Sequence, residues 1–127
     1  MKLFRTEINP GLIFPEKINW KNSFVFLGSC FADKISDKLK QQGLQVHSNP
    51  SGVLYNPQSI ATLIQNSLDL KVWGEQDCIK QAKKLILPYI QGTPDNPIEF
   101  IHQCQNELHQ KLKRNDLLII TFGTAWA

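Results

Sequence analysis

A turn of small residues follows the first apolar segment, and its serine is the residue best placed to do chemistry. Residues 24–27 form a continuous apolar run, and Gly28, Ser29 and Cys30 follow it directly. Gly28 permits a tight turn, and a helix that begins at Ser29 would aim free backbone N–H groups at a bound anion. This setting suits a serine that attacks an ester carbonyl, because the N–H groups would stabilise the oxyanion. The alternative is a serine whose side chain only caps the helix.

Two further turns follow predicted strands later in the sequence. One contains Asn49 and Gly52, and the other contains Gly123 and Thr124. Because the carboxyl ends of parallel strands meet at one edge of a sheet, we expect the three turns to form one site there. In that site Gly52 either places its N–H group near the oxyanion or only satisfies the geometry of its turn.

Three residues beside these turns have both a structural and a functional interpretation. Asn49 is interpreted as a turn former, and Asn56 as a helix cap because Pro57 follows it. Cys30, at a helix start, is either a reactive thiolate or a small residue packed behind the turn, and we expect the packed position. With Gly28 and Gly123, these residues make up the loops that support the site.

The other side chains able to do chemistry are few. The cysteines lack the spacing of metal ligands, and their odd number does not indicate a disulfide framework. Among the three histidines, His47 lies nearest the expected site, at the end of the second strand. We expect His102 and His109 at exposed or boundary positions of a helix. The sequence therefore predicts no metal ion and no organic cofactor.

Apolar runs of strand length alternate with amphipathic helices along the chain, which indicates βαβ units and a mostly parallel sheet. The predicted strands are residues 23–27, 44–48, 85–87 and 117–122. The helices begin at Ser29, Asn56 and Asn96, and the first ends at Gly43. The side chains expected to form their apolar faces are Phe31, Ile35 and Leu39 in the first, Ile60, Leu63, Ile64 and Leu68 in the second, and Ile101, Cys104, Leu108 and Leu112 in the third.

The length and composition indicate one domain of ordinary size, residues 1–127. Residues 1–22 are predicted to form an irregular leader. Apolar residues make up 42% and charged residues 20%, which excludes a disordered chain. The net charge of +3 predicts no nucleic-acid binding, and the basic cluster at residues 111–114 is interpreted as a solvated helix face. No segment reads as a membrane span or a signal peptide, so we expect a cytoplasmic protein without a membrane partner.

Three blocks of the sequence, in order, resemble the GSCFA family, which is named for the pentapeptide at residues 28–32. The blocks are residues 26–32, 49–57 and 121–126. The family is similar to the SGNH hydrolase superfamily of GDSL-like esterases, lipases and acyl transferases. The resemblance implies a flavodoxin-like three-layer α/β/α fold with Ser29 as the nucleophile. It also implies an oxyanion hole made by the N–H groups of Ser29 and Gly52, with Thr124 where the superfamily usually has an asparagine.

One expected block of that superfamily is missing. Its Asp-x-x-His motif, which supplies the catalytic base, does not occur in the 127 residues. The chain therefore resembles the N-terminal part of a longer family member, with an incomplete sheet. We predict that it is inert, or nearly so, on its own, because Ser29 lacks a group to accept its proton.

The function predicted from the sequence is that of a serine-dependent acyl-ester hydrolase or acyl transferase. Its small-molecule substrate would be an acylated carbohydrate or a similar small ester. The alternative is a non-catalytic α/β domain that binds an anion or a phosphorylated metabolite at the same turns. A third hypothesis is a thiol role for Cys30. An incomplete sheet could also expose a strand edge through which copies of the chain form a homo-oligomer.

Overall fold

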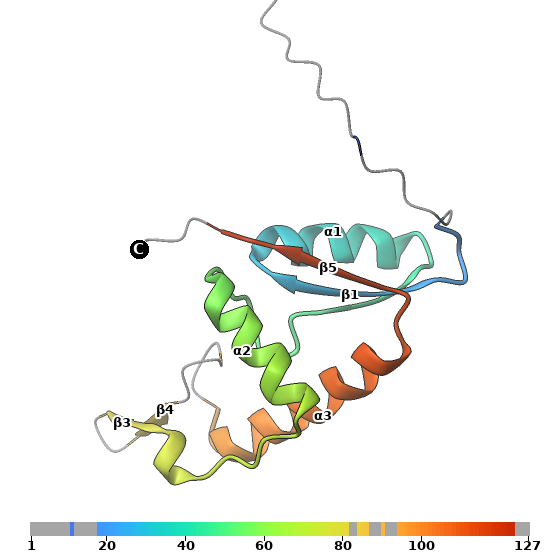
Figure 1. Ribbon diagram of the computed structural model, residues 1–127. Coiled ribbons are helices and arrows are strands. Elements are labelled where there is room, and N and C mark those ends of the chain that lie inside the picture. Colours follow the sequence, from blue (N-terminus) through green and yellow to red (C-terminus); the bar gives the residue numbers. More distant parts are fainter. Residues whose placement is uncertain (1–10, 12–17, 82–83, 87–89, 91–93, 124–127) are drawn as a thin grey trace, which may run out of the picture.

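A parallel sheet of three strands forms the centre of the protein. The structure is a computed structural model that describes residues 11, 18–81, 84–86, 90 and 94–123. The strands are β1 (Ser23–Gly28), β2 (Gln45–Ser48) and β5 (Leu117–Thr121), in the order β2-β1-β5. Helix α1 (Cys30–Gln41) covers one face, and α2 (Pro57–Leu68) and α3 (Pro97–Arg114) lie on the other (Figure 1). The predicted three-layer α/β/α arrangement is therefore confirmed; Thr124 and most of the expected leader lie outside the described residues.

The central strand β1 contributes to a core on both faces of the sheet. Phe24 and Phe26 pack with the α1 side, whereas Val25 and Leu27 pack with residues of α2 and α3. All four side chains are at most 3% exposed. Burying one such side chain contributes about 2 kcal/mol to the free energy of unfolding. Because both faces of β1 are covered, positions 24–27 are all apolar instead of alternate positions.

The two connections place β2 and β5 on opposite sides of β1. The chain runs through α1 to β2 on one side of β1, and returns through α2 and α3 to β5 on the other side. Both neighbours pair with β1 in parallel. The carboxyl ends of β1 and β5 therefore lie where the strand order reverses, which is the place where open α/β sheets bind ligands.

Local signals fixed the helix boundaries that the sequence predicts. The side chains of Asn56 and Asn96 accept the N–H groups of Gln58 and Glu99, and a proline follows each cap. Gly43 has a φ of +87°, the left-handed conformation expected after a helix end. These three predictions are confirmed.

The segment between α2 and α3 forms structure outside the main sheet. It contains the short helix η1 (Glu75–Asp77) and the antiparallel strands β3 (Ile79–Gln81) and β4 (Lys84–Ile86). A strand was expected at residues 85–87, but β4 pairs with β3 and takes no part in the parallel sheet. Three residue pairs join β3 and β4, so this hairpin is a local unit.

Most side chains of the predicted apolar faces of α1 and α2 pack against the core, namely Ile35, Leu39, Ile60, Leu63 and Ile64, but one side chain in each helix does not. Phe31 is 60% exposed and Leu68 is 47% exposed, whereas Ala32, Ser36 and Ser67 are completely buried. Small side chains at the closest contact let a helix approach its neighbours, and the larger ones are then displaced toward solvent. The apolar face of α3 is as expected, with Ile101, Cys104 and Leu108 buried and Leu112 partly buried.

Polar groups also join α2 to α3. Gln105 is 2% exposed, accepts the indole N–H of Trp73, and donates to the carbonyl oxygens of Asn66 at 2.9 Å and Lys71 at 3.2 Å. His109 was expected at an exposed or boundary position, but it is buried with Nδ1 2.9 Å from the carbonyl oxygen of Ser67. That expectation was wrong because the crossing of α2 over α3 covers this imidazole.

The far side of β5 has no strand partner within the described residues. Alternate side chains of the strand, Leu118 and Ile120, are 37% and 38% exposed, and Phe122 beyond them is 61% exposed. The exposed strand edge expected from the sequence is therefore present among these residues, and association of copies through it stays a prediction. In the described part of the chain, no helix has the length and apolar character needed to cross a bilayer.

The buried amide of Gln105 provides a test of the packing between α2 and α3. Gln105→Leu removes three hydrogen bonds that join α3 to α2 and to the segment that follows α2, and should lower the free energy of unfolding by about 2 kcal/mol. Gln103→Leu, at an exposed position of the same helix, should change it by less than about 0.5 kcal/mol. Urea unfolding followed by tryptophan fluorescence measures both. Equal effects would contradict the role of Gln105.

Candidate functional site

Backbone hydrogen bonds bring the three turns together at the carboxyl edge of the sheet. Ser29 N–H donates to the carbonyl oxygen of Thr121 at 3.2 Å. Leu54 N–H donates to Gly28 at 2.8 Å, and Gly123 N–H donates to Tyr55 at 3.3 Å. The turn after β1, the turn after β2 and the turn after β5 therefore meet, as the strand order requires.

Gly28 stands at the closest contact between two of these turns. Its φ is +133°, and it pairs with Thr121 in the sheet register. A Cβ atom at position 28 would lie 1.9 Å from the carbonyl oxygen of Thr121. Any side chain would therefore clash with backbone, and only glycine lets β1 end beside β5 in this way.

Ser29 is buried at the start of α1, but its side chain does not cap the helix. The residue is 6% exposed and occupies the N-cap position without a side-chain cap bond. Its Oγ lies 3.1 Å from Oγ1 of Thr121 instead, and its N–H also donates to that Oγ1 at 3.1 Å. The helix-cap interpretation of this serine is therefore not what the structure shows.

The role of Thr121 was not found from the sequence. Its position follows from the parallel register, which places the end of β5 opposite Gly28. The only available signal was a hydroxyl residue at the end of the last apolar run. That signal becomes specific only once the neighbour of β5 is known to be β1.

Asn49 holds the turn before Ser29 in place. Its Oδ1 accepts the N–H of Gly28 at 2.8 Å, and its Nδ2 donates to Oδ1 of Asp33 at 2.7 Å. The residue has a φ of +39°, and its own carbonyl oxygen accepts the N–H of Gly52 at 2.9 Å. Asn49 is thus the turn former that the sequence suggested, and it also connects the first two turns. Asp33 was not anticipated.

The N–H groups expected in the oxyanion hole have partners inside the chain. Ser29 donates to Thr121, and Gly52 donates to Asn49. The third expected donor, Thr124, lies outside the described residues. Cys30 and Phe31 begin α1, so their N–H groups have no acceptor within the helix and point to the same edge.

Residues near Ser29 differ in exposure from what the sequence suggested. Cys30 is exposed, so the expectation that it packs behind the turn was wrong. Tyr55 lies beside it, and the charge of a Cys30 thiolate, followed by desolvation, raises the pKa of the tyrosine.

Ser51 is 1% exposed, and its hydroxyl has no hydrogen-bond partner among the described residues. Asn56 caps α2 and takes no part in the contacts around Ser29.

The three histidines make their polar contacts with groups other than Ser29. His47 Nδ1 is 3.3 Å from a carboxylate oxygen of Glu107. His102 accepts the N–H of Trp73 at 3.0 Å, and His109 contacts Ser67. The residues described therefore offer Ser29 no imidazole, and they contain no group of three or more metal-ligating side chains.

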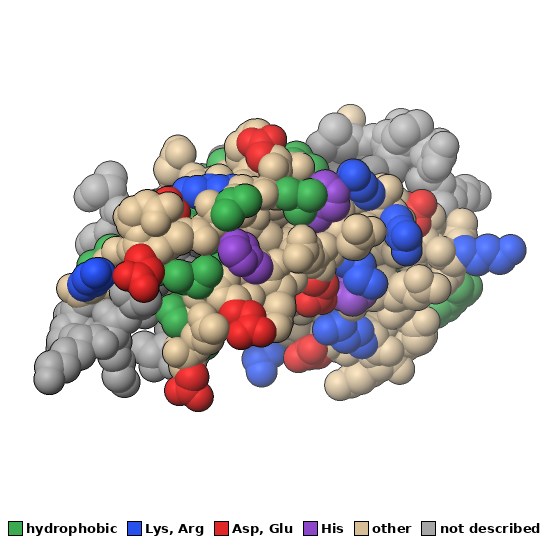
Figure 2. Space-filling view, turned by 90° about the horizontal axis from the view of Figure 1, so that it is seen from below, with side chains coloured by type: hydrophobic (Ala, Val, Ile, Leu, Met, Phe, Trp, Pro, Cys, Tyr) green, Lys and Arg blue, Asp and Glu red, His purple; other side chains and the backbone are tan. Residues whose placement is uncertain are grey.

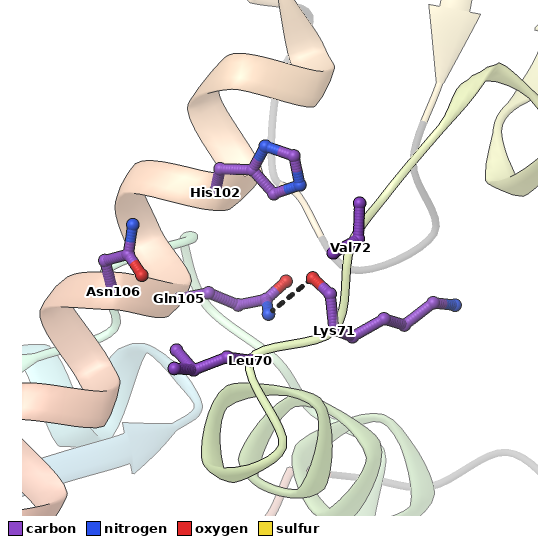
Figure 3. A pocket seen from close by; sticks show the side chains of 6 residues that line it. All are labelled: Leu70, Lys71, Val72, His102, Gln105 and Asn106. Atoms are coloured by element: carbon purple, nitrogen blue, oxygen red, sulfur yellow. Dashed lines mark hydrogen bonds between the residues drawn. The ribbon is translucent and has the colours of Figure 1, made fainter.

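A hollow of about 250 Å³ lies away from the three turns, between α3 and the segment after α2 (Figure 3). His102, Gln105 and Asn106 line it from α3, and residues 70–72 line it from the other side. The amide of Gln105 and Nε2 of His102 are already bonded to the chain itself. Those groups hold the two segments together, so this hollow is a weaker candidate site than the turn at Ser29.

Exchanging the side chains at positions 49 and 33 tests how Asn49 supports the turn at Ser29. Asn49→Asp removes the donor to Asp33 and places two carboxylates in contact, which should lower stability by about 2 kcal/mol or more. Adding Asp33→Asn restores a donor and an acceptor in the reversed direction, and should recover most of the loss. A double-mutant cycle of urea unfolding measures this coupling. Additive effects of the two substitutions would contradict it.

The alkylation rates of two cysteines test the burial of Cys104 and the exposure of Cys30. Burial raises the pKa of Cys104 to about 11, and its thiol donates to the carbonyl oxygen of Pro50. A raised pKa keeps the thiol protonated at pH 8, so iodoacetamide should modify Cys104 at least about tenfold more slowly than the exposed Cys30. Peptide mass spectrometry measures both rates, and the denatured protein is the control. Similar rates in the native protein would contradict the burial of Cys104.

Comparison with known proteins identifies the family. A search of curated proteins and a search of solved structures each found no match. A family model described as the GSCFA family matches residues 23–127, a range that includes β1, all three turns and Ser29. The chain therefore belongs to the GSCFA family.

Proposed function

We propose that this chain carries the nucleophile of a serine-dependent acyl-ester hydrolase or acyl transferase, and that the nucleophile is Ser29. One observation supports this most. The Ser29 hydroxyl stands at the carboxyl edge of a parallel sheet, where the strand order reverses, and it does not make the capping bond usual for a serine at a helix start. Its contact with Thr121 Oγ1 at 3.1 Å instead orients it at the meeting point of three turns.

The reaction would proceed in two steps. Ser29 Oγ forms a bond to the carbonyl carbon of an ester while a base accepts its proton, and the carbonyl oxygen becomes an oxyanion. Collapse of this intermediate breaks the bond to the alcohol, which leaves with a proton. Water, or a second alcohol, then attacks the acyl-serine and regenerates Ser29. Water makes the protein a hydrolase and an acceptor alcohol makes it an acyl transferase.

The oxyanion would be stabilised by N–H groups at the three turns. The proposed donors are Ser29 and Gly52, with Thr124 as a hydroxyl donor. Because Ser29 and Gly52 donate within the chain, they would have to exchange or share those bonds with the substrate. The N–H of Cys30 lies next to Ser29 at the positive end of α1 and is a further donor for the same charge.

The proton acceptor is the missing part. Thr121 Oγ1 contacts Ser29, but a hydroxyl is too weak a base to accept a proton at neutral pH. The three histidines contact Glu107, Trp73 and Ser67 instead. A base from outside the described residues, such as the histidine of an Asp-x-x-His motif, is therefore part of this proposal.

The surroundings of Ser29 favour a small acyl group. Only 6% of the residue is exposed, so a slim acyl group such as acetyl would reach it more easily than a bulky one. Exposed aromatic side chains belong to each of the three turns: Phe31, Tyr55 and Phe122. Aromatic faces suit an apolar or carbohydrate partner, so an acetylated carbohydrate or similar small ester is the proposed substrate.

A chemical test uses the 127-residue chain itself. A fluorophosphonate probe should label Ser29 slowly, and added imidazole should accelerate the labelling by at least about tenfold, because it supplies the missing base. Ser29→Ala should abolish the labelling. Ser51→Ala is the matched control, because Ser51 is also buried and belongs to the second turn; it should leave the labelling unchanged.

Each outcome of this experiment decides one part of the proposal. No labelling of Ser29, with or without imidazole, would overturn the catalytic role and leave an anion-binding domain as the explanation. Equally fast labelling without imidazole would show that the chain already contains its base. Labelling that moves to Cys30 would support the thiol hypothesis instead.

A further inference from the structure

A second hollow, of about 240 Å³, lies at the amino-terminal edge of the sheet, opposite the edge that holds Ser29. It is formed where β1 and β2 begin and α3 ends. Its polar lining comes from Ser23, Gln45, His47, Lys111, Arg114 and Asn115. Figure 2 shows that Lys and Arg side chains are more frequent toward one end of this face of the molecule, with Asp and Glu side chains between them.

The charges around this hollow are unevenly balanced. The described residues contain three ion pairs: His47 with Glu107, Lys71 with Asp77, and Lys80 with Glu75. Lys111 and Arg114 take part in none of them. Asp116, which follows α3, does not line the hollow; its carboxylate accepts the N–H of Ser23 at 2.7 Å. Within the described part of the chain, the lining therefore presents two cations that belong to no ion pair.

We propose that this hollow binds a phosphate group of a small molecule. Arg114 has the planar donor fork that matches phosphate oxygens, and Lys111 adds a second positive charge. The side-chain amides of Gln45 and Asn115 supply neutral donors. The Glu107 carboxylate 3.3 Å from His47 Nδ1 orients the imidazole on the β2 side of the hollow. The ligand is free inorganic phosphate or the phosphate of a metabolite, since the enclosed volume suits a small group rather than a polymer.

Another explanation exists for the same cations. Lysine and arginine in the last turn of a helix interact favourably with the negative end of its dipole, whatever lies beside them. The last turn of α3 contains Lys113 as well as Lys111 and Arg114. Lys113 has the same relation to the dipole but does not line the hollow. Substitutions at Lys113 can therefore be compared with substitutions at Lys111 and Arg114. A binding site depends on the two residues that line the hollow, whereas an interaction with the helix dipole depends on all three.

The experiment measures the thermal midpoint of the 127-residue chain at pH 7 with inorganic phosphate, against sodium chloride of equal ionic strength. Phosphate that binds the folded state raises the midpoint as its concentration increases, by linkage. Arg114→Gln and Lys111→Gln should remove most of this increase, and Arg114→Lys should retain part of it. Lys113→Gln and Ser29→Ala should retain all of it. A sugar phosphate in place of inorganic phosphate distinguishes the two sources by the size of the shift.

Several results would overturn the proposal. These are the absence of a phosphate-specific increase in the wild-type chain, and an increase that Lys113→Gln lowers as much as Arg114→Gln does. If a variant is too unstable for thermal analysis, phosphate titration followed by backbone amide NMR replaces it. Shifts confined to residues 23, 45–47 and 111–115 support the site. Shifts at residues 28–31 instead would place the anion at the Ser29 turn and overturn it.

Discussion

The close contact between Gly28 and Thr121 is the constraint on which the site depends. Because β1 and β5 pair in parallel, the last residues of both strands lie opposite each other. No side chain fits between them, since a Cβ atom at position 28 would lie 1.9 Å from the Thr121 carbonyl oxygen. The chain must therefore turn at once into α1, and Ser29 is placed beside the end of β5 as a result.

The remaining structure keeps that contact in position. The apolar side chains of β1 bury both faces of the strand, which fixes it between α1 and the pair of α2 and α3. Asn49 then connects the turn after β2 to Gly28 and to Asp33 on α1. One asparagine side chain thus joins three consecutive elements around the serine, and the second turn cannot shift without disturbing the first.

Sequence patterns predict those features that depend on neighbours along the chain. The apolar run of β1, the asparagine caps of α2 and α3 and the left-handed Gly43 all follow local rules, and the structure confirms them. Three parallel strands also bring the three turns together, as expected. The location of the candidate site was therefore available from the sequence alone.

Features that depend on contacts between distant segments were not available in this way. Cys30 and Phe31 are exposed because the rotation of α1 is decided by the small residues that face the sheet. The burial of His109 depends on how α2 crosses α3. The pairing of Ser29 with Thr121 depends on strand register, which no short motif encodes.

The missing cap of α1 has a consequence for both stability and reactivity. A serine side chain that caps a helix accepts an N–H group of the first turn and stabilises the protein by about 1 kcal/mol. Helix α1 lacks this bond, because the Ser29 hydroxyl is turned toward Thr121. The Phe31 N–H in the first turn of α1 consequently has no acceptor within the helix, whereas the Ala32 N–H donates to the carbonyl oxygen of Ser29 at 2.9 Å. In the function proposed above, this weaker helix start would leave a backbone donor of α1 available for the negative charge that develops on the substrate.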